Sequence, residues 1–169
     1  MRAITHNATE TINLGQGFAR GLKGGEVVLL IGDLGAGKTT FVKGVAAGLG
    51  VKRTVNSPTF VIMKVYEVGR GGEGQRAKGP EPELPLVVRF RASKGQNSQV
   101  KNLVHIDTYR GLSIADLENI GALEYFGRND TICFVEWGEG LEEYLGTRKI
   151  ETTVVKIKNI DSETREIII

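Results

Sequence analysis

Cysteine and long apolar runs are scarce in this sequence of 169 residues. Its one cysteine, Cys133, excludes a disulfide within the chain and a metal site built from cysteine alone. No apolar run approaches the roughly 18 residues of a membrane-spanning helix, and residues 1–7 lack the apolar core of a secretory signal. Neither sign of charge dominates, because 22 Lys and Arg against 20 Asp and Glu leave only +2, too little for a surface that binds nucleic acid or membrane as a whole. We therefore expect a soluble, cytoplasmic protein with a single domain over residues 1–169.

Glycine is abundant by contrast, with 23 residues, which is about twice the usual share of roughly 7%. Six of these glycines and three of the four prolines fall in residues 69–102. The same segment carries seven Lys or Arg against three Glu, so the weak positive charge of the chain is concentrated there. We interpret residues 69–102 as a basic, Gly/Pro-rich insertion, and its first part, about residues 69–85, as a flexible loop.

The rest of the hydrophobic pattern predicts helices and strands in alternation. Helices are predicted where apolar residues recur at helical spacing, at residues 8–22, at 38–48 and after Ser113. Strands are predicted at the apolar runs 27–31, 59–65, 103–107 and 131–136. Alternation over residues 150–160 and 164–169 predicts a C-terminal β-hairpin. This order is typical of an α/β domain with a mixed sheet.

The turn between the first long strand and the second helix has the spacing of a phosphate-binding loop. It reads Gly32-Asp33-Leu34-Gly35-Ala36-Gly37-Lys38-Thr39, with two glycines separated by four residues and followed by Lys-Thr. Glycines let the backbone curl so that successive N–H groups converge on phosphate oxygens, and the helix N-terminus adds further donors. Lys38 can then contact the β- and γ-phosphates, and the Thr39 hydroxyl can bind Mg²⁺. A chance match is the alternative, but the position between a strand and a helix favours a P-loop NTPase-like three-layer domain with a mixed, mainly parallel β-sheet.

Two carboxylates, Asp107 and Glu136, end predicted strands and are candidates to hold a magnesium ion beside this loop. The carboxyl ends of the strands are where α/β sheets bind ligands, which favours a shared role for the pair. Either carboxylate taken alone is equally well an ordinary solvated residue. His105 shares a sheet face with Asp107 by alternation, but a histidine within the core is the favoured interpretation, and Cys133 is interpreted as core as well.

Four blocks of residues, taken together, resemble the TsaE family (also called YjeE or YdiB), bacterial P-loop ATPases of tRNA threonylcarbamoyladenosine synthesis. In chain order the blocks are Gly32-Asp33-Leu34-Gly35-Ala36-Gly37-Lys38-Thr39-Thr40, Ser57-Pro58-Thr59-Phe60, His105-Ile106-Asp107-Thr108-Tyr109-Arg110 and Val135-Glu136-Trp137. Their order and spacing agree with the family over most of the chain. The insertion at 69–102 is longer than the family's usual connection, and Gly138 stands where the family often has proline.

The resemblance implies an ATP and Mg²⁺ site and gives individual residues a role in it. Lys38, Asp107 and Glu136 would be catalytic, with Thr39 and Glu136 holding magnesium and Asp107 close to the ion or to the attacking water. The segment Ser57–Thr59 would be switch-like, although a plain turn explains it equally well from the residues alone. The nucleotide-binding residues implied are Thr11 near the base and, around the phosphates, Asp33, Leu34, Gly35, Ala36, Gly37, Lys38, Thr39, Thr40 and Thr59.

The resemblance also implies a partner. Family members bind the TsaB–TsaD complex, which transfers a threonylcarbamoyl group to tRNA, and their ATP hydrolysis, slow without the partner, is expected to reset that complex. Contact with tRNA would be indirect or weak. The basic insertion could contribute to such a contact, although a solvated surface insertion is favoured.

Other functions stay open at this point. A small-molecule kinase would use the same phosphate cradle and could close arginines 70, 76, 89 and 91 over its substrate. A nucleotide-gated binding module would use the cradle with little turnover. A GTPase is disfavoured, because the sequence holds no Asn-Lys-x-Asp motif for guanine.

Overall fold

The computed structural model describes residues 1–58, 62–69, 99–109 and 111–169. Nearly all of the predicted insertion, together with the predicted nucleotide-binding residue Thr59, lies outside the described residues. Within them, no helix is both long enough and apolar enough to cross a membrane.

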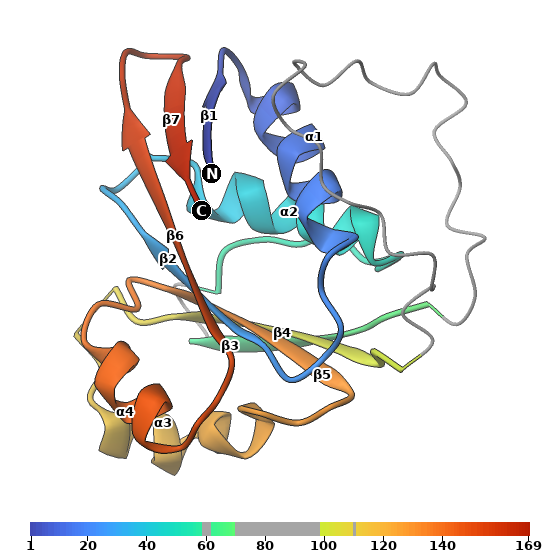
Figure 1. Ribbon diagram of the computed structural model, residues 1–169, viewed down its shortest axis with the longest axis vertical. Helices are drawn as coiled ribbons and strands as arrows, with labels where there is room; N and C mark the ends of the chain where they lie inside the picture. Colours follow the sequence, from blue (N-terminus) through green and yellow to red (C-terminus); the bar gives the residue numbers. More distant parts are fainter. Residues whose placement is uncertain (59–61, 70–98, 110) are drawn as a thin grey trace.

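Strands and helices follow one another along the chain largely as the pattern predicts (Figure 1). The strands are β1 (Arg2–Thr5), β2 (Val27–Ile31), β3 (Met63–Glu67), β4 (Asn102–Asp107), β5 (Thr131–Glu136), β6 (Thr152–Asn159) and β7 (Arg165–Ile168). The α-helices are α1 (Ala8–Ala19), α2 (Lys38–Gly48), α3 (Ile114–Asn119) and α4 (Leu141–Thr147), and a 3₁₀ turn, η1, covers Ala122–Tyr125.

In the described part of the chain the seven strands form one sheet in the order β1-β7-β6-β2-β5-β4-β3. The four central strands, β6, β2, β5 and β4, are parallel to one another. The antiparallel pairs lie at the edges, where β3 pairs with β4 and β7 runs between β6 and β1. The predicted α/β fold with a mixed, mainly parallel sheet and a C-terminal hairpin is therefore confirmed.

Helices cover both faces of the sheet, which gives the predicted three layers (Figure 1). Strand β2 shows why both faces are needed, because its first four side chains are fully buried and alternate between two separate apolar clusters. One cluster contains Phe41 and other residues of α1 and α2, and the second contains Leu117 of α3 and Leu145 of α4.

Helices α1 and α2 pack so closely that glycine is required where they meet. A Cβ added to Gly15 would lie 2.4 Å from the Phe41 carbonyl oxygen, and one added to Gly44 would lie 2.1 Å from the Ile12 carbonyl oxygen. Atoms cannot approach at these distances, so only glycine allows this contact. The contact fixes α2 against the sheet and thereby the position of its N-terminus, where the phosphate-binding loop ends.

Several element bounds differ from the prediction. Helix α1 ends at Ala19 rather than at residue 22, and β3 begins at Met63, with residues 59–61 of the predicted strand outside the described ranges. Strand β1, helix α4 and the 3₁₀ turn η1 were not predicted. Asn7 caps α1, because its side chain accepts a hydrogen bond from the Glu10 backbone N–H at 2.9 Å.

Candidate functional site

The turn from β2 to α2 leaves the N-terminus of α2 open toward the carboxyl edge of the parallel strands. Gly37 is the N-cap residue, with a φ of 105°, and it supplies no capping side chain. A Cβ at Gly37 would meet nothing within 4 Å, so glycine is needed here for its left-handed backbone and not for space. The first N–H groups of α2 therefore have no capping side chain, which is the arrangement that binds anions.

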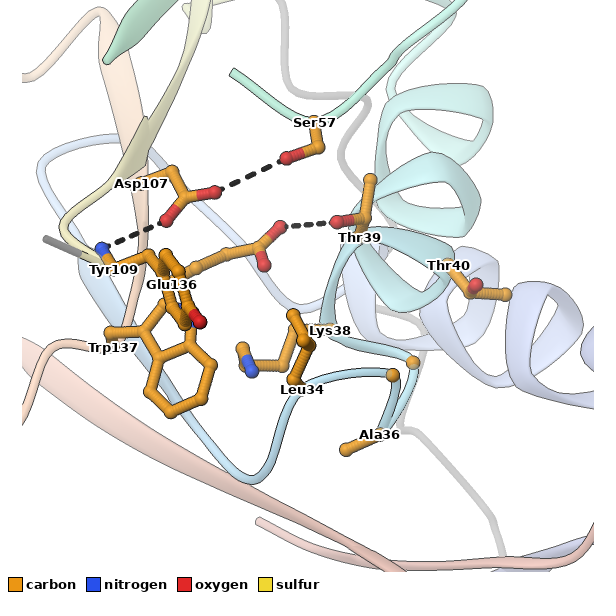
Figure 2. Close-up of a pocket in the computed structure, with 12 residues that line it drawn as sticks. Leu34, Ala36, Lys38, Thr39, Thr40, Ser57, Asp107, Tyr109, Glu136 and Trp137 are labelled. Atoms are coloured by element: carbon orange, nitrogen blue, oxygen red, sulfur yellow. Dashed lines mark hydrogen bonds between the residues drawn. The ribbon is translucent and has the colours of Figure 1, made fainter. Parts of the chain in front are cut away.

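A cavity of about 300 Å³ lies at this helix end (Figure 2). Its lining brings together the loop, the start of α2 and the ends of β4 and β5: Leu34, Gly35, Ala36, Gly37, Lys38, Thr39, Thr40, Ser57, Asp107, Tyr109, Glu136 and Trp137. The sequence analysis named ten of these twelve as site residues or as part of the switch-like segment. Tyr109 and Trp137 had no predicted role. Trp137 directly follows the carboxylate that ends β5, and Tyr109 follows shortly after the carboxylate that ends β4.

Two of the predicted residues that the structure describes are not in this lining. The side chain of Asp33 is exposed, although its backbone carbonyl faces Lys38. Thr11 is 2% exposed, and its hydroxyl lies 2.8 Å from the hydroxyl of Thr5 on β1. A role for Thr11 near a nucleotide base therefore stays a prediction.

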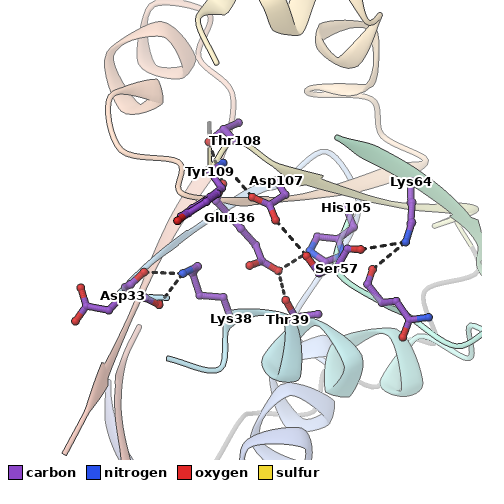
Figure 3. Close-up of polar contacts among 12 residues, drawn as sticks. Asp33, Lys38, Thr39, Ser57, Lys64, His105, Asp107, Thr108, Tyr109 and Glu136 are labelled. Atoms are coloured by element: carbon purple, nitrogen blue, oxygen red, sulfur yellow. Dashed lines mark hydrogen bonds and ion pairs between the residues drawn. The ribbon is translucent and has the colours of Figure 1, made fainter. Parts of the chain in front are cut away.

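Glu136 is the centre of the polar contacts in this cavity (Figure 3). Its Oε1 accepts a hydrogen bond from the Thr39 hydroxyl at 2.6 Å, and His105 Nε2 lies 2.8 Å from the same oxygen. His105 is fully buried, as the core interpretation expected, but the sequence analysis missed its contact with Glu136. Only alternation on β4, which puts His105 on the same face as Asp107, could have indicated it.

Asp107 lies opposite Glu136 in the β4–β5 register but has different partners. Its Oδ1 accepts from the Tyr109 backbone N–H at 3.0 Å, and its Oδ2 accepts from the Ser57 hydroxyl at 3.1 Å (Figure 2). The Ser57 carbonyl in turn accepts from Lys64 Nζ of β3 at 3.1 Å. The segment around Ser57 is therefore connected to the ends of two strands beside the cavity.

The oxygen ligands in the cavity suit magnesium better than a softer metal. The described residues contain no cluster of three or more His, Cys, Asp or Glu side chains able to hold a metal ion. What they do contain is the Thr39 hydroxyl and the Glu136 carboxylate side by side, next to the glycine-rich loop between β2 and α2. Magnesium is commonly bound by one or two such protein oxygens, with phosphate and water supplying the rest.

Lys38 is held against the cavity wall by the loop itself. Its Nζ donates to the carbonyl oxygens of Gly32 at 2.6 Å and Asp33 at 3.0 Å, and it lies 3.7 Å from the centroid of the Trp137 ring. Burial lowers the pKa of the Lys38 ammonium, while Glu136 and other nearby carboxylates oppose this shift. The result is a buried cation with carbonyl partners that an anion can replace.

The turn that follows β5 positions Trp137. Its φ of 60° is unusual for a residue other than glycine, and Thr108 stabilises the turn by directing its hydroxyl at the carbonyl oxygens of Glu136 (3.0 Å) and Trp137 (2.7 Å). The Trp137 ring also packs against Tyr109, with 5.2 Å between the ring centroids. These contacts form one aromatic wall of the cavity, beside the ammonium of Lys38.

A family model and individual curated proteins both match this chain over most of its length. The family described as "Threonylcarbamoyl adenosine biosynthesis protein TsaE" matches residues 5–75 and 85–167. A curated protein of Bacillus subtilis (strain 168), named tRNA threonylcarbamoyladenosine biosynthesis protein TsaE, is 37% identical over 96% of this chain and 80% of its own length. A protein of the same name from Treponema pallidum is 33% identical over 99% of this chain and 98% of its own length.

A solved structure resembles the fold as well. The crystal structure of YdiB from Bacillus subtilis superimposes with a TM-score of 0.61 and 31% sequence identity, covering 99% of this chain and 82% of that one. The similarity therefore extends over the sheet, both helical layers and the turn from β2 to α2.

Proposed function

Because this chain belongs to the TsaE family of tRNA threonylcarbamoyladenosine biosynthesis, we propose that it is a magnesium-dependent ATPase that acts in this pathway on the TsaB–TsaD complex. The observation that carries the ATPase part is the Thr39–Glu136 contact of 2.6 Å beside the open N-terminus of α2. It joins a candidate magnesium site to a candidate phosphate site in one cavity. The partner complex is inferred from the family alone.

Binding would use the loop amides, the N-terminus of α2 and Lys38. A triphosphate in the cavity would meet the backbone of Gly35 and Gly37, both of which line it. The Lys38 ammonium would exchange its contacts with two loop carbonyls for phosphate oxygens. Such charge-assisted hydrogen bonds are roughly twice as strong as neutral ones, so they are expected to dominate affinity.

Hydrolysis would place a water molecule in line with the γ-phosphorus. The water oxygen forms a bond to that phosphorus, the bond to the oxygen bridging the β- and γ-phosphates breaks, and ADP, phosphate and a proton result. Asp107 would orient the water, and Thr39 and Glu136 would hold Mg²⁺. The ion, when bound, neutralises charge on the β- and γ-phosphate oxygens.

The deciding experiment is reconstitution of threonylcarbamoyladenosine formation on tRNA with TsaB, TsaD and threonylcarbamoyl adenylate supplied as the donor, with and without this protein. We expect repeated turnover only when the protein and ATP are both present, and faster ATP hydrolysis with the TsaB–TsaD complex than alone. The Lys43→Ala variant is a control that should support modification as well as the unmodified chain does, because Lys43 is an exposed lysine on the same helix as Lys38 but does not line the cavity. Modification that proceeds equally without the protein would contradict the proposal.

Two further measurements separate the other two functions. A small-molecule kinase would transfer phosphate to a metabolite, which mass spectrometry of an extract incubated with ATP would detect. A nucleotide-gated binding module would support modification equally well with a non-hydrolysable ATP analogue. The arginines that a kinase could close over its substrate, at positions 70, 76, 89 and 91, lie outside the described residues.

A further inference from the structure

Arg165 links the far end of the chain to the phosphate-binding loop. It is the first residue of β7, where it pairs with Asn159 of β6 and Thr5 of β1. Its Nε donates a hydrogen bond to the carbonyl oxygen of Ala36 at 3.1 Å, across 129 positions in the sequence. No local sequence motif predicts this contact, because it depends on the sheet bringing β7 beside the turn between β2 and α2.

The remaining donors of Arg165 are directed at the turn between β6 and β7. They reach the carbonyl oxygens of Asp161 at 3.0 Å, Thr164 at 3.1 Å and Ser162 at 3.2 Å. A guanidinium is a rigid, planar fork, so these three bonds fix its orientation. Arg165 is thereby pre-set to present one N–H to Ala36.

The Ala36 carbonyl belongs to the peptide that carries the N–H of Gly37. The described residues contain no cis peptide bond, and in a trans peptide the C=O and N–H point in opposite directions. Ala36 is fully buried, and Gly37 lines the cavity. Holding the Ala36 oxygen toward Arg165 therefore directs the Gly37 N–H away from Arg165 and toward the cavity.

This peptide needs an external constraint because of the glycine beside it. Gly37 has a φ of 105° and no atom within 4 Å of the position where a Cβ would stand. Glycine populates positive and negative φ about equally, so rotation of the Ala36–Gly37 peptide meets little steric resistance at this residue. A rotated peptide would turn a carbonyl oxygen toward the cavity and repel an anion.

We propose that Arg165 is a positioning residue that holds the Ala36–Gly37 peptide in the orientation that binds phosphate. The ligand part of this inference rests on the proposed function, because the anion concerned is the triphosphate of the nucleotide. The conformational part does not, since the contact is made between two residues of the chain itself. The two parts can be tested separately.

The test compares Arg165→Met with two matched variants. Asp161→Ala disturbs the same turn without touching Ala36, because the Asp161 carboxylate accepts from the backbone N–H groups of Glu163 (2.8 Å) and Thr164 (2.7 Å). Arg148→Met removes an arginine that stacks on Tyr144 of α4, 3.8 Å from its ring centroid. Calorimetry then measures the affinity of each protein for ATP and for inorganic triphosphate.

We expect Arg165→Met to bind both compounds at least about tenfold more weakly, and Arg148→Met to stay within about twofold of the unmodified chain. Asp161→Ala should lose clearly less affinity than Arg165→Met, because it loosens the turn that orients Arg165 but keeps the donor for Ala36. In the absence of ligand, the Gly37 amide signal in an NMR spectrum should shift or broaden in Arg165→Met alone. Arg165→Lys keeps the charge but not the fork, and should recover little of the lost affinity.

Three results would overturn the inference: unchanged triphosphate affinity in Arg165→Met, an equal loss in Asp161→Ala, or full recovery in Arg165→Lys. The last of these would reduce the role of Arg165 to its charge. If the unmodified chain bound neither ATP nor triphosphate, the proposed function would fail instead. The Gly37 amide signal would then still decide the conformational part.

Discussion

Replacing Lys38 by methionine should weaken nucleotide binding by an amount that the structure limits. The substitution removes the ammonium and keeps most of the length of the side chain. In the structure this ammonium donates to two loop carbonyls, at 2.6 Å and 3.0 Å, and lies over the Trp137 ring. A triphosphate therefore does not meet a solvated lysine, and binding exchanges one set of contacts for another.

This exchange of contacts determines how much nucleotide affinity is lost in Lys38→Met. A hydrogen bond to one charged group contributes about 1.5–3 kcal/mol, so two new bonds to phosphate with nothing given up would contribute about 3–6 kcal/mol. The two carbonyl contacts that are given up offset about half of this, because only the ammonium is ionised in each of them, whereas both partners are ionised in a bond to phosphate. The binding free energy that remains, about 1.5–3 kcal/mol, corresponds to nucleotide binding that is about 10- to 150-fold weaker in Lys38→Met.

The same substitution should not destabilise the free protein. Burial lowers the pKa of Lys38, which means that the folded state holds the ammonium less favourably than water does. Methionine in its place removes that cost together with the carbonyl contacts. We expect a Tm equal to or above that of the unmodified chain, measured by calorimetry without nucleotide.

Isothermal titration with ADP and a non-hydrolysable ATP analogue, each with Mg²⁺, measures the effect on binding. Lys43→Met is the control, because Lys43 is exposed on α2 and is absent from the cavity lining. Affinity within about twofold of the unmodified chain would show that Lys38 does not contact phosphate. A loss far beyond about a thousandfold would show that the contacts with Gly32 and Asp33 persist in the bound state and are not exchanged.

Three further predictions concern other parts of the molecule. Glu136→Gln should reduce ATP hydrolysis by about a hundredfold or more in a phosphate-release assay, while ATP affinity changes only a few-fold. The reason is that the lost charge matters most in the transition state. An equal loss of hydrolysis and of affinity would contradict this prediction. Gly44→Ala should lower the free energy of unfolding, measured in urea, by at least about 1–3 kcal/mol, because its Cβ would lie 2.1 Å from the Ile12 carbonyl oxygen. Gly146→Ala is the control and should not lower it, because its Cβ would meet nothing within 4 Å. Cys133 is 1% exposed and burial raises the pKa of its thiol, so it should react with a thiol reagent at neutral pH only when the chain unfolds; rapid labelling of the folded protein would refute this.

The elements that the sequence predicts best are those whose signal is local. Strand β2 and helix α2 have the predicted bounds, 27–31 and 38–48. Every residue of β2 is apolar because both faces of the strand are covered by helices, and the glycine-rich motif marks where the strand ends and the helix begins. No partner from elsewhere in the chain is needed to recognise either element.

The missed elements depend on partners that are distant in the sequence. Strand β1 has only four residues, and its pairing with β7 near the other end of the chain is what makes it a strand. Helix α4 has seven residues, begins after Gly140 without a capping side chain and contains Gly146. Its one helical signal is the pair Leu141 and Leu145, which bury one face against the sheet. Neither segment is long enough for its periodicity to be recognised.

The two carboxylates of the site show the same limit at the level of single contacts. The sequence places Asp107 and Glu136 at strand ends, and the register then sets them directly opposite each other. Two carboxylates so close would repel each other unless each had its own donors. The structure supplies them separately: Thr39 and His105 face Glu136, whereas Ser57 and the Tyr109 N–H face Asp107. These partners come from three segments, helix α2, the segment of Ser57 and the end of β4, so spacing along the chain does not encode the whole pairing. The separation directs Glu136 toward the phosphate-binding loop and Asp107 toward the segment of Ser57, and this difference is the physical basis for giving the two carboxylates different roles.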